Sequence, residues 1–131
     1  METKIKMRYL LDTHIILWWL TTPDAIQKKA QKIIKDRSNA VYISSASLWE
    51  MAIKKSIGRL TLPHNLIEMI AMESFKILPI NAEESLGIAD LPMHHTDPFD
   101  RLLIMQAKLN DLILITRDSK MADYPVITLP G

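Results

Sequence analysis

Short apolar segments rich in β-branched and aromatic residues alternate with helix-like segments along the whole chain. Strands are predicted at residues 8–12, 40–44, 75–80, 112–116 and 126–129. Helices are predicted at residues 13–21, 24–36, 45–57, 63–74, 81–90 and 97–111. This alternation is typical of a mainly parallel central sheet with helices on both of its faces. We therefore expect an α/β fold with three layers and about four to five strands.

Three residues are expected to mark helix ends. Thr13 and Asp97 carry side-chain oxygens at predicted helix starts, where such oxygens accept hydrogen bonds from main-chain N–H groups. Pro98 is favoured at the first helical position and supports a start directly after Asp97. Gly58 is expected to end the helix at 45–57, because glycine readily adopts the left-handed conformation found there.

Composition narrows the classes of protein to which the chain can belong. Its 131 residues, 48% hydrophobic and 24% charged, suit a single folded domain over residues 1–131. Without cysteine, neither a disulfide nor a cysteine zinc site is available. The N-terminus lacks a signal-peptide pattern and the run "IILWWL" is too short to cross a bilayer, so we expect a cytoplasmic protein without membrane contact. A net charge of +1 leaves nucleic-acid binding to local basic clusters.

Two aspartates follow predicted strands. Asp12 closes the first strand, and Asp118 comes two residues after the strand at 112–116. Because parallel strands end at the same edge of a sheet, we expect both carboxylates at that edge, where ligands of α/β sheets gather. Aspartate is also common in turns and caps, and each residue taken alone fits either role.

The helix predicted at 97–111 carries an acid on its apolar side. Asp100 is in line with Leu103, Ile104 and Ala107, which predicts that its carboxylate faces inward and favours a functional role. An acid in the first turn also gains from the helix dipole, but that gain does not require an inward face. Asp97 is explained as the N-cap, and it can also orient a neighbouring ligand.

Glu50 has two interpretations. With Ser47 it matches a capping box, in which the glutamate reaches back to the start of its helix. If Ser44 or Ser45 caps the helix instead, Glu50 lies well inside it and is free to join a site. The sequence leaves both interpretations open.

These acids form a chemically informative set if the fold brings them together. Clustered carboxylates repel, and burial raises their pKa values, so a fold retains such a cluster when a cation offsets the repulsion. Carboxylate oxygens without sulfur ligands suit Mg²⁺ or Mn²⁺. Such ions polarise a phosphate and activate water, which predicts hydrolysis of phosphodiesters by in-line attack of water.

Four segments, which follow one another over nearly the whole chain, carry a family resemblance: "LLDTHIILWW", "SASLWEMAIKKSIGRL", "LPMHHTDPFDRLLIMQA" and "LILITRDSKMADYPV". They resemble the PIN-domain ribonucleases and, more narrowly, the VapC-like toxins of bacterial type II toxin–antitoxin pairs. The stretch "HHTDPFDR" is the most specific of them. By position, the resemblance places the acidic metal-binding and catalytic set of the family on Asp12, Glu50, Asp100 and Asp118.

The same resemblance implies supporting residues and partners. It places the small hydroxyl residue of the family on Thr116, and Asp97 belongs to the toxin motif. Independently of the resemblance, Thr13 starts the helix after Asp12 and is expected to fix the direction of that acid. It implies an endoribonuclease dependent on Mg²⁺ or Mn²⁺, with RNA as substrate, dimeric, and neutralised by a cognate antitoxin protein.

Other residues near the proposed acids have ordinary explanations as well. Lys54, Arg101 and Arg117 are candidates for guiding an RNA backbone, although charged residues usually belong to a solvated face. His94 and His95 fit polar loop residues better than metal ligands. Of Trp18 and Trp19, one is expected in the core and the other at the surface.

Two other classes of protein compete with the nuclease. A receiver or phosphatase domain suits the chain length, but Asp12 lacks the acidic neighbour of receivers, and His14 stands where haloacid-type phosphatases have a second aspartate. A non-catalytic module that binds protein or RNA keeps the same fold. The complete acidic set argues against it.

Overall fold

The computed structural model describes residues 7–131. Its centre is a five-stranded sheet in the order β3-β2-β1-β4-β5, and every neighbouring pair of strands is parallel. The strands are β1 (Arg8–Leu11), β2 (Ala40–Ser44), β3 (Lys76–Leu78), β4 (Ile113–Thr116) and β5 (Thr128–Pro130).

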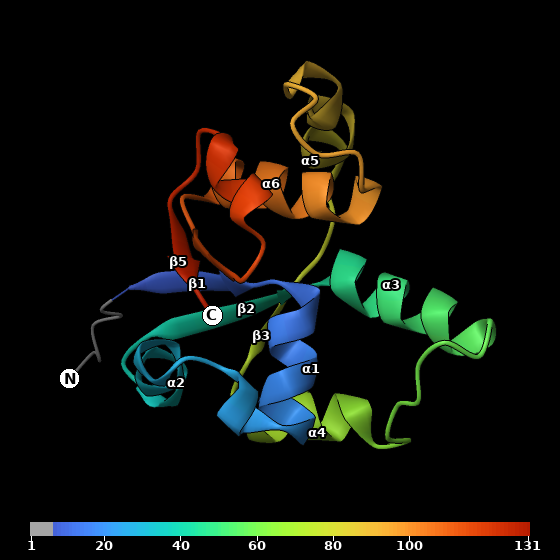
Figure 1. The fold of residues 1–131 in the computed structure, drawn as a ribbon, viewed down its shortest axis with the longest axis vertical. Coiled ribbons are helices and arrows are strands. Elements are labelled where there is room, and N and C mark those ends of the chain that lie inside the picture. Colours follow the sequence, from blue (N-terminus) through green and yellow to red (C-terminus); the bar gives the residue numbers. More distant parts are fainter. Residues whose placement is uncertain (1–6) are drawn as a thin grey trace.

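The helices cover both faces of this sheet (Figure 1). In that view α5 (Ala82–Gly87) and α6 (Pro98–Asn110) lie above the sheet, and α1 (Thr13–Thr21), α2 (Lys28–Lys35) and α4 (Leu66–Met72) lie below it. The helix α3 (Ser45–Ser56) extends to one side from the end of β2. The short 3₁₀ helices are η1 (Pro23–Ala25), η2 (Ile88–Asp90) and η3 (Ser119–Asp123). The expected three-layer α/β fold is confirmed.

The central strand β1 supplies both hydrophobic cores. Successive side chains of a strand point to opposite faces, and Leu10 and Leu11 are both fully buried. Leu11 packs with Ile15 and other residues of the core on the α1 side, whereas Leu10 packs with Leu103 and other residues of the core on the α6 side. Burying one such side chain stabilises the fold by about 1.5–3 kcal/mol, so two covered faces explain the continuous apolar run in β1.

Several helix boundaries differ from the sequence-based expectations. The predicted helix at 24–36 is shorter, because Pro23–Ala25 forms η1 and Ile26 is extended (φ −88°, ψ 140°) before α2 begins at Lys28. Likewise, α4 begins at Leu66 rather than at residue 63, and the segment 81–90 divides into α5 and η2.

The expected helix caps are confirmed in two of three cases. The Asp97 carboxylate accepts hydrogen bonds at the start of α6, and Gly58 follows α3 with φ +76°. The cap of α1 is Asp12 rather than Thr13, which is its first helical residue. This shift matters for function, because it fixes the carboxylate of Asp12 at the junction between β1 and α1.

The tryptophans also differ from expectation. Trp18 and Trp19 are both partly buried and pack against the core on the α1 side, so neither is fully buried and neither is fully exposed. The exposed tryptophan is Trp49 on α3, with 59% of its surface accessible, and its ring meets Phe99 edge-on. Within residues 7–131, the helices are all too short or too polar to cross a bilayer.

Candidate metal centre

The carboxyl edge of the sheet brings Asp12 and Asp118 together. Leu11 in β1 pairs with Ile115 in β4, so the residues that follow each strand leave the sheet side by side. Asp12 directly follows β1, is 5% exposed, and donates its main-chain N–H to the Ile115 carbonyl at 3.0 Å. Asp118 comes after Thr116, at the N-cap of η3. The expected shared edge is therefore present.

Two threonines hold the carboxylate of Asp12. Its Oδ1 accepts the Thr13 main-chain N–H at 2.6 Å, and its Oδ2 accepts the Thr116 hydroxyl at 2.7 Å. The Thr116 oxygen also accepts the main-chain N–H of Asp118 at 3.0 Å. Thr116 thus connects the two acids, and both carboxylate oxygens of Asp12 have fixed directions.

Glu50 lies inside α3 and joins the same group. Ser44 caps the helix by accepting the Ala46 N–H at 3.0 Å, so the capping box with Ser47 is not formed. Glu50 is 6% exposed, and its Oε1 accepts the hydroxyl of Thr13 at 2.8 Å. The interpretation that places Glu50 in a site is therefore the one that the structure supports.

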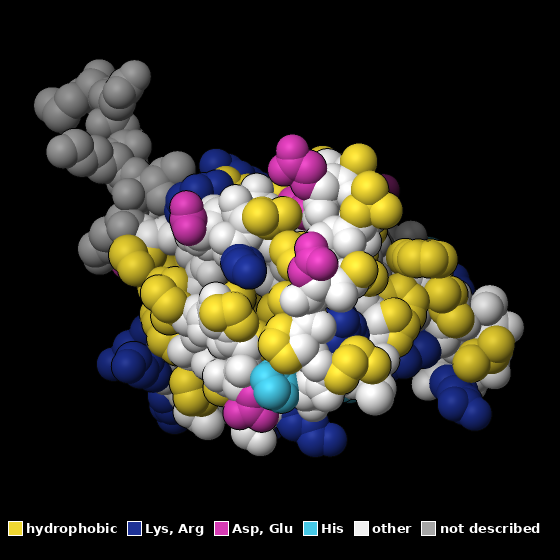
Figure 2. Space-filling model, turned by 90° about the horizontal axis from the view of Figure 1, so that it is seen from above, with side chains coloured by type: hydrophobic (Ala, Val, Ile, Leu, Met, Phe, Trp, Pro, Cys, Tyr) yellow, Lys and Arg dark blue, Asp and Glu magenta, His cyan; other side chains and the backbone are white. Residues whose placement is uncertain are grey.

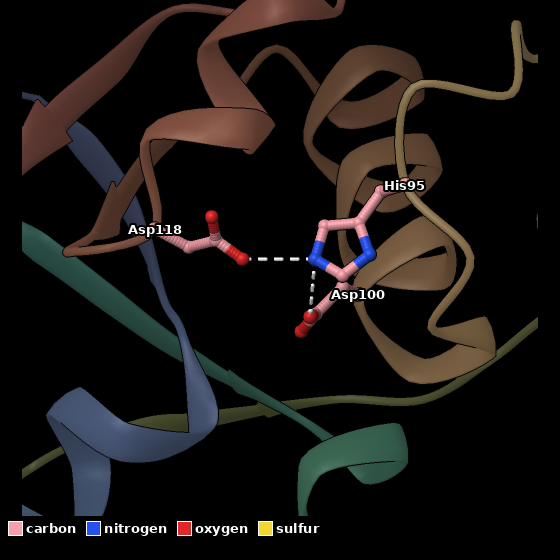
Figure 3. A group of neighbouring side chains, drawn as sticks. All are labelled: His95, Asp100 and Asp118. Atoms are coloured by element: carbon pink, nitrogen blue, oxygen red, sulfur yellow. Dashed lines mark hydrogen bonds and ion pairs between the residues drawn. The ribbon is translucent and has the colours of Figure 1, made fainter.

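The start of α6 supplies Asp100. Asp97 Oδ1 accepts the main-chain N–H groups of Phe99 and Asp100 at 2.8 and 3.2 Å, which fixes the first turn of the helix. The Asp100 side chain is 17% exposed, and its carboxylate meets the same nitrogen of a histidine ring as the carboxylate of Asp118 (Figure 3).

That histidine, His95, is the functional candidate that sequence reasoning missed. Its Nε2 lies 2.8 Å from Asp118 Oδ2 and 3.1 Å from Asp100 Oδ2 (Figure 3). These three side chains bring ligand atoms within 4.8 Å of one another, a spacing that suits a metal ion. The pair of histidines before Asp97 was the only signal, and the two are not equivalent, because His94 instead stacks edge-on against Tyr124.

Burial and crowding raise the pKa of Asp100. Desolvation, and to a lesser extent the nearby carboxylates of Asp12, Asp97, Glu50 and Asp118, together raise it from 3.8 to about 8. The effect of these acids on one group shows that the whole predicted set is close enough to interact. Uncompensated negative charge of this kind is what a divalent cation would neutralise.

The other two shifted acids respond to different causes. Burial raises the pKa of Asp12, although the hydrogen bond from Thr116 partly opposes the rise. For Asp118 burial acts upward, but hydrogen bonds from His95 and the Lys120 N–H outweigh it and lower the pKa. The centre therefore holds carboxyl groups of unequal acidity within one hydrogen-bonded group.

The donor set fits Mg²⁺ or Mn²⁺ by its chemistry. Asp12, Glu50, Asp100 and Asp118 provide carboxylate oxygens, which these hard ions prefer. The chain contains no cysteine that would favour a softer metal. Hydrogen bonds connect Asp12, Thr13, Glu50, Thr116 and Asp118 at this edge, and Asp100 joins them only through the ring of His95.

Two of the three predicted RNA-binding residues have structural roles instead. Arg101 is 9% exposed, and its guanidinium donates to main-chain carbonyls, among them those of Ile88 at 2.7 Å and Pro92 at 2.9 Å. Because the loop before α6 encloses the side chain, the structure gives no support to its predicted contact with RNA.

Arg117 lies at the surface but holds the chain end to the fold. Its guanidinium donates to the carbonyls of Gly131 and Ala25 and stacks over Trp18, with 4.3 Å between the guanidinium carbon and the ring centroid. This arrangement gives no support to its predicted RNA contact. Lys54 lies 3.0 Å from Glu50 Oε2 and is 40% exposed, so it remains beside the centre and accessible.

The PIN-domain family model matches residues 9–127, which include the acids at the carboxyl edge of the sheet. The chain belongs to the PIN-domain family. A comparison with curated protein sequences finds no match.

Solved structures with the same fold cover nearly the whole chain. VapBC2 from Rickettsia felis, solved bound to a DNA fragment from its promoter, has a TM-score of 0.71 at 16% identity and covers 95% of this chain and 98% of its own. A toxin–antitoxin complex from Klebsiella pneumoniae has a TM-score of 0.61 at 22% identity, with 94% and 98% covered. FitAcB from Neisseria gonorrhoeae has a TM-score of 0.59 at 21% identity, with 94% and 96% covered.

Proposed function

We propose that this PIN-domain protein is a metal-dependent endoribonuclease and the toxin of a type II toxin–antitoxin pair. The observation that carries the nuclease proposal is the convergence of Asp12, Glu50, Asp100 and Asp118, from four separate segments, at one edge of the sheet. A fold gains nothing from repulsion between acids, so their convergence needs a function that uses a cation.

Each side chain has a distinct proposed role. Asp12 and Asp100 are the main metal ligands, and Glu50 and Asp118 complete the site directly or through water. Bound Mg²⁺ or Mn²⁺ would polarise the scissile phosphate and lower the pKa of a water molecule. Thr116 orients Asp12 by donating to its Oδ2 at 2.7 Å.

The protein supplies orientation and charge rather than a covalent nucleophile in this proposal. Thr13 donates to Glu50, and Lys54 pairs with the other oxygen of that carboxylate at 3.0 Å. Lys54 is placed to attract an RNA phosphate toward the centre. On the face over α5 and α6, basic side chains are scattered among hydrophobic and acidic ones (Figure 2), so this face does not form a basic track.

The toxin assignment rests on the family and on the neighbouring structures. One neighbour is described as a toxin–antitoxin complex and another as VapBC2. We infer that this chain acts on RNA in the cytoplasm, is neutralised by a cognate antitoxin protein, and forms a homodimer. An adjacent gene for a small DNA-binding protein would support the pairing.

Cleavage of RNA in the presence of Mg²⁺ or Mn²⁺ tests the nuclease. We expect Asp12→Asn and Asp100→Asn each to lower the rate at least about 100-fold, because each removes a charged metal ligand. Asp111→Asn is the matched control, since Asp111 ends the same helix as Asp100 at its far end and has φ 53°, which asparagine also tolerates.

The outcomes separate the competing classes. Equal rates for the parent and both site variants would refute the assignment of Asp12 and Asp100. Absence of both cleavage and divalent-metal binding, measured by calorimetry, would favour a non-catalytic binding module.

A further inference from the structure

The hydrogen bonds of His95 define which of its nitrogens carries the proton. The main-chain N–H of Asp97 donates to Nδ1 of the ring at 3.1 Å. A nitrogen that accepts a hydrogen bond carries no proton, so in the neutral ring the proton is on Nε2. Nε2 therefore presents an N–H group, and not a lone pair, to Asp100 and Asp118.

This tautomer is the wrong one for metal binding through Nε2. A histidine ligand binds through an unprotonated nitrogen, and its other nitrogen usually donates a proton to a carbonyl or carboxylate. If Nε2 of His95 gave up its proton to bind a metal, Nδ1 would carry one and would face the N–H of Asp97. Two N–H groups would then oppose each other within hydrogen-bonding distance.

The ring also lies where a cation would meet the acids. Nε2 donates to Asp118 Oδ2 at 2.8 Å and lies 3.1 Å from Asp100 Oδ2, so its N–H occupies the space beside both oxygens. The ring is held there, because the His95 side chain is only 12% exposed and its main-chain N–H donates to the Tyr124 hydroxyl at 2.8 Å. A metal that bridges the two Oδ2 atoms from the side of the ring would therefore have to displace this N–H.

We infer that His95 competes with the divalent ion for Asp100 and Asp118 and does not ligate it. This inference rests on the proposed metal-dependent function and adds a residue that sets metal affinity. A metal that bridges these two oxygens from the side of the ring displaces the hydrogen bond from Nε2 to Asp118, and the strength of that bond subtracts from the binding free energy. His95 is thus a positioning residue that orients the Asp118 carboxylate at the expense of metal affinity.

Two substitutions separate the two nitrogens. In His95→Asn the amide oxygen occupies the place of Nδ1 and can still accept from the Asp97 N–H, but no group reaches the acids. In His95→Gln the amide nitrogen occupies the place of Nε2 and can still donate to them. Calorimetric titration with Mg²⁺, and separately with Mn²⁺, measures the affinity of each variant and of the parent.

We expect His95→Asn to bind both ions about tenfold more tightly than the parent, because a hydrogen bond to a charged group contributes at least a tenfold factor. His95→Gln should stay within about threefold of the parent, because it keeps a donor to the acids. Equal or weaker binding by His95→Asn would overturn the inference. Absence of metal binding by the parent and both variants would instead refute the proposed function together with it.

Spectroscopy of the unaltered protein gives a second test that does not depend on the variants folding. Histidine ¹⁵N chemical shifts distinguish the two tautomers, and Mg²⁺ is diamagnetic. We expect the Nε2–H tautomer for His95 without Mg²⁺, and the same tautomer with a shifted Nε2 signal after Mg²⁺ is added. A change to the Nδ1–H tautomer with Mg²⁺ would show that Nε2 is a ligand and would refute the inference.

Discussion

Replacing Thr116 by valine tests whether the link between Asp12 and Asp118 supports the centre. The substitution keeps the β-branched shape in β4 but removes the hydroxyl, which donates to Asp12 Oδ2 at 2.7 Å and accepts from the Asp118 N–H at 3.0 Å. Thr116 is 5% exposed, so water cannot easily replace the lost partner.

The expected cost follows from these two contacts. A hydrogen bond to a charged group contributes about 1.5–3 kcal/mol, and we take about 2 kcal/mol for the lost bond to Asp12. For a domain of this size that lowers Tm by roughly 7 °C. The lost bond also removes an interaction that opposes the raised pKa of Asp12. A further rise in that pKa weakens metal binding, because the ligand must be ionised.

Thermal unfolding and calorimetric titration with Mg²⁺ measure the two effects. Thr128→Val is the matched control. Thr128 lies in the neighbouring strand β5 and pairs with Leu114, which comes two residues before Thr116 in β4. If Thr116→Val matches the control in both Tm and metal affinity, the link through Thr116 does not support the centre.

Two further predictions follow from Asp100 and Arg101. The pKa of Asp100 is raised from 3.8 to about 8, so between these pH values the folded state binds a proton that the unfolded state does not. The contribution of protonated Asp100 to stability is therefore complete below pH 3.8 and is lost as the pH rises toward 8. Denaturant titrations without metal should show that loss in the parent and not in Asp100→Asn, and equal slopes would refute it. Arg101→Lys should lower the free energy of unfolding by about 2–4 kcal/mol, because lysine cannot replace the guanidinium fork among buried carbonyls. The control Lys55→Ala removes an exposed charge on α3 and should change the free energy of unfolding little. If Arg101→Lys lost RNA affinity but kept its stability, the structural role of Arg101 would be contradicted.

The sequence predicted best where the cause of a structure is local. Asp97 and Pro98 define the start of α6, and the apolar stripe after Asp100 correctly placed that acid on the inner side. The parallel sheet also follows from local patterns, because its strands alternate with helices. The start of α2 was predicted too early because of Ile26. This buried residue has an extended backbone, but an apolar residue at its position fits the apolar side of a helix equally well.

Residues whose role depends on a distant partner were the ones that sequence reasoning misjudged. Arg101 stands beside an acid in the sequence, but the carbonyls of the loop that precedes α6 enclose it. His95 lies in the same loop, and only the fold places its ring between Asp100 and Asp118. Nothing in the spacing of either residue reports such contacts, because they arise when the loop closes over α6.

The relative positions of α3 and α6 show how the core determines the geometry of the centre. Ser44 caps α3, the helix that carries Glu50. The Ser44 hydroxyl also donates to Gln106 Oε1 in α6, the helix that carries Asp100. Gln106 Nε2 in turn donates to Glu84 Oε1 in α5 at 3.1 Å. Ser44 and Gln106 are fully buried and Glu84 is 1% exposed, so misplacing either helix would leave buried polar groups without partners.

Apolar packing alone would hold these helices less specifically. Cores of suitable volume tolerate shifted and repacked side chains, whereas a buried hydrogen bond fails when its atoms move by an ångström. The Ser44–Gln106 bond therefore accounts for the fixed spacing between the segments that deliver Glu50 and Asp100. The carboxylates meet at the edge of the sheet because polar contacts inside the core hold their helices in register.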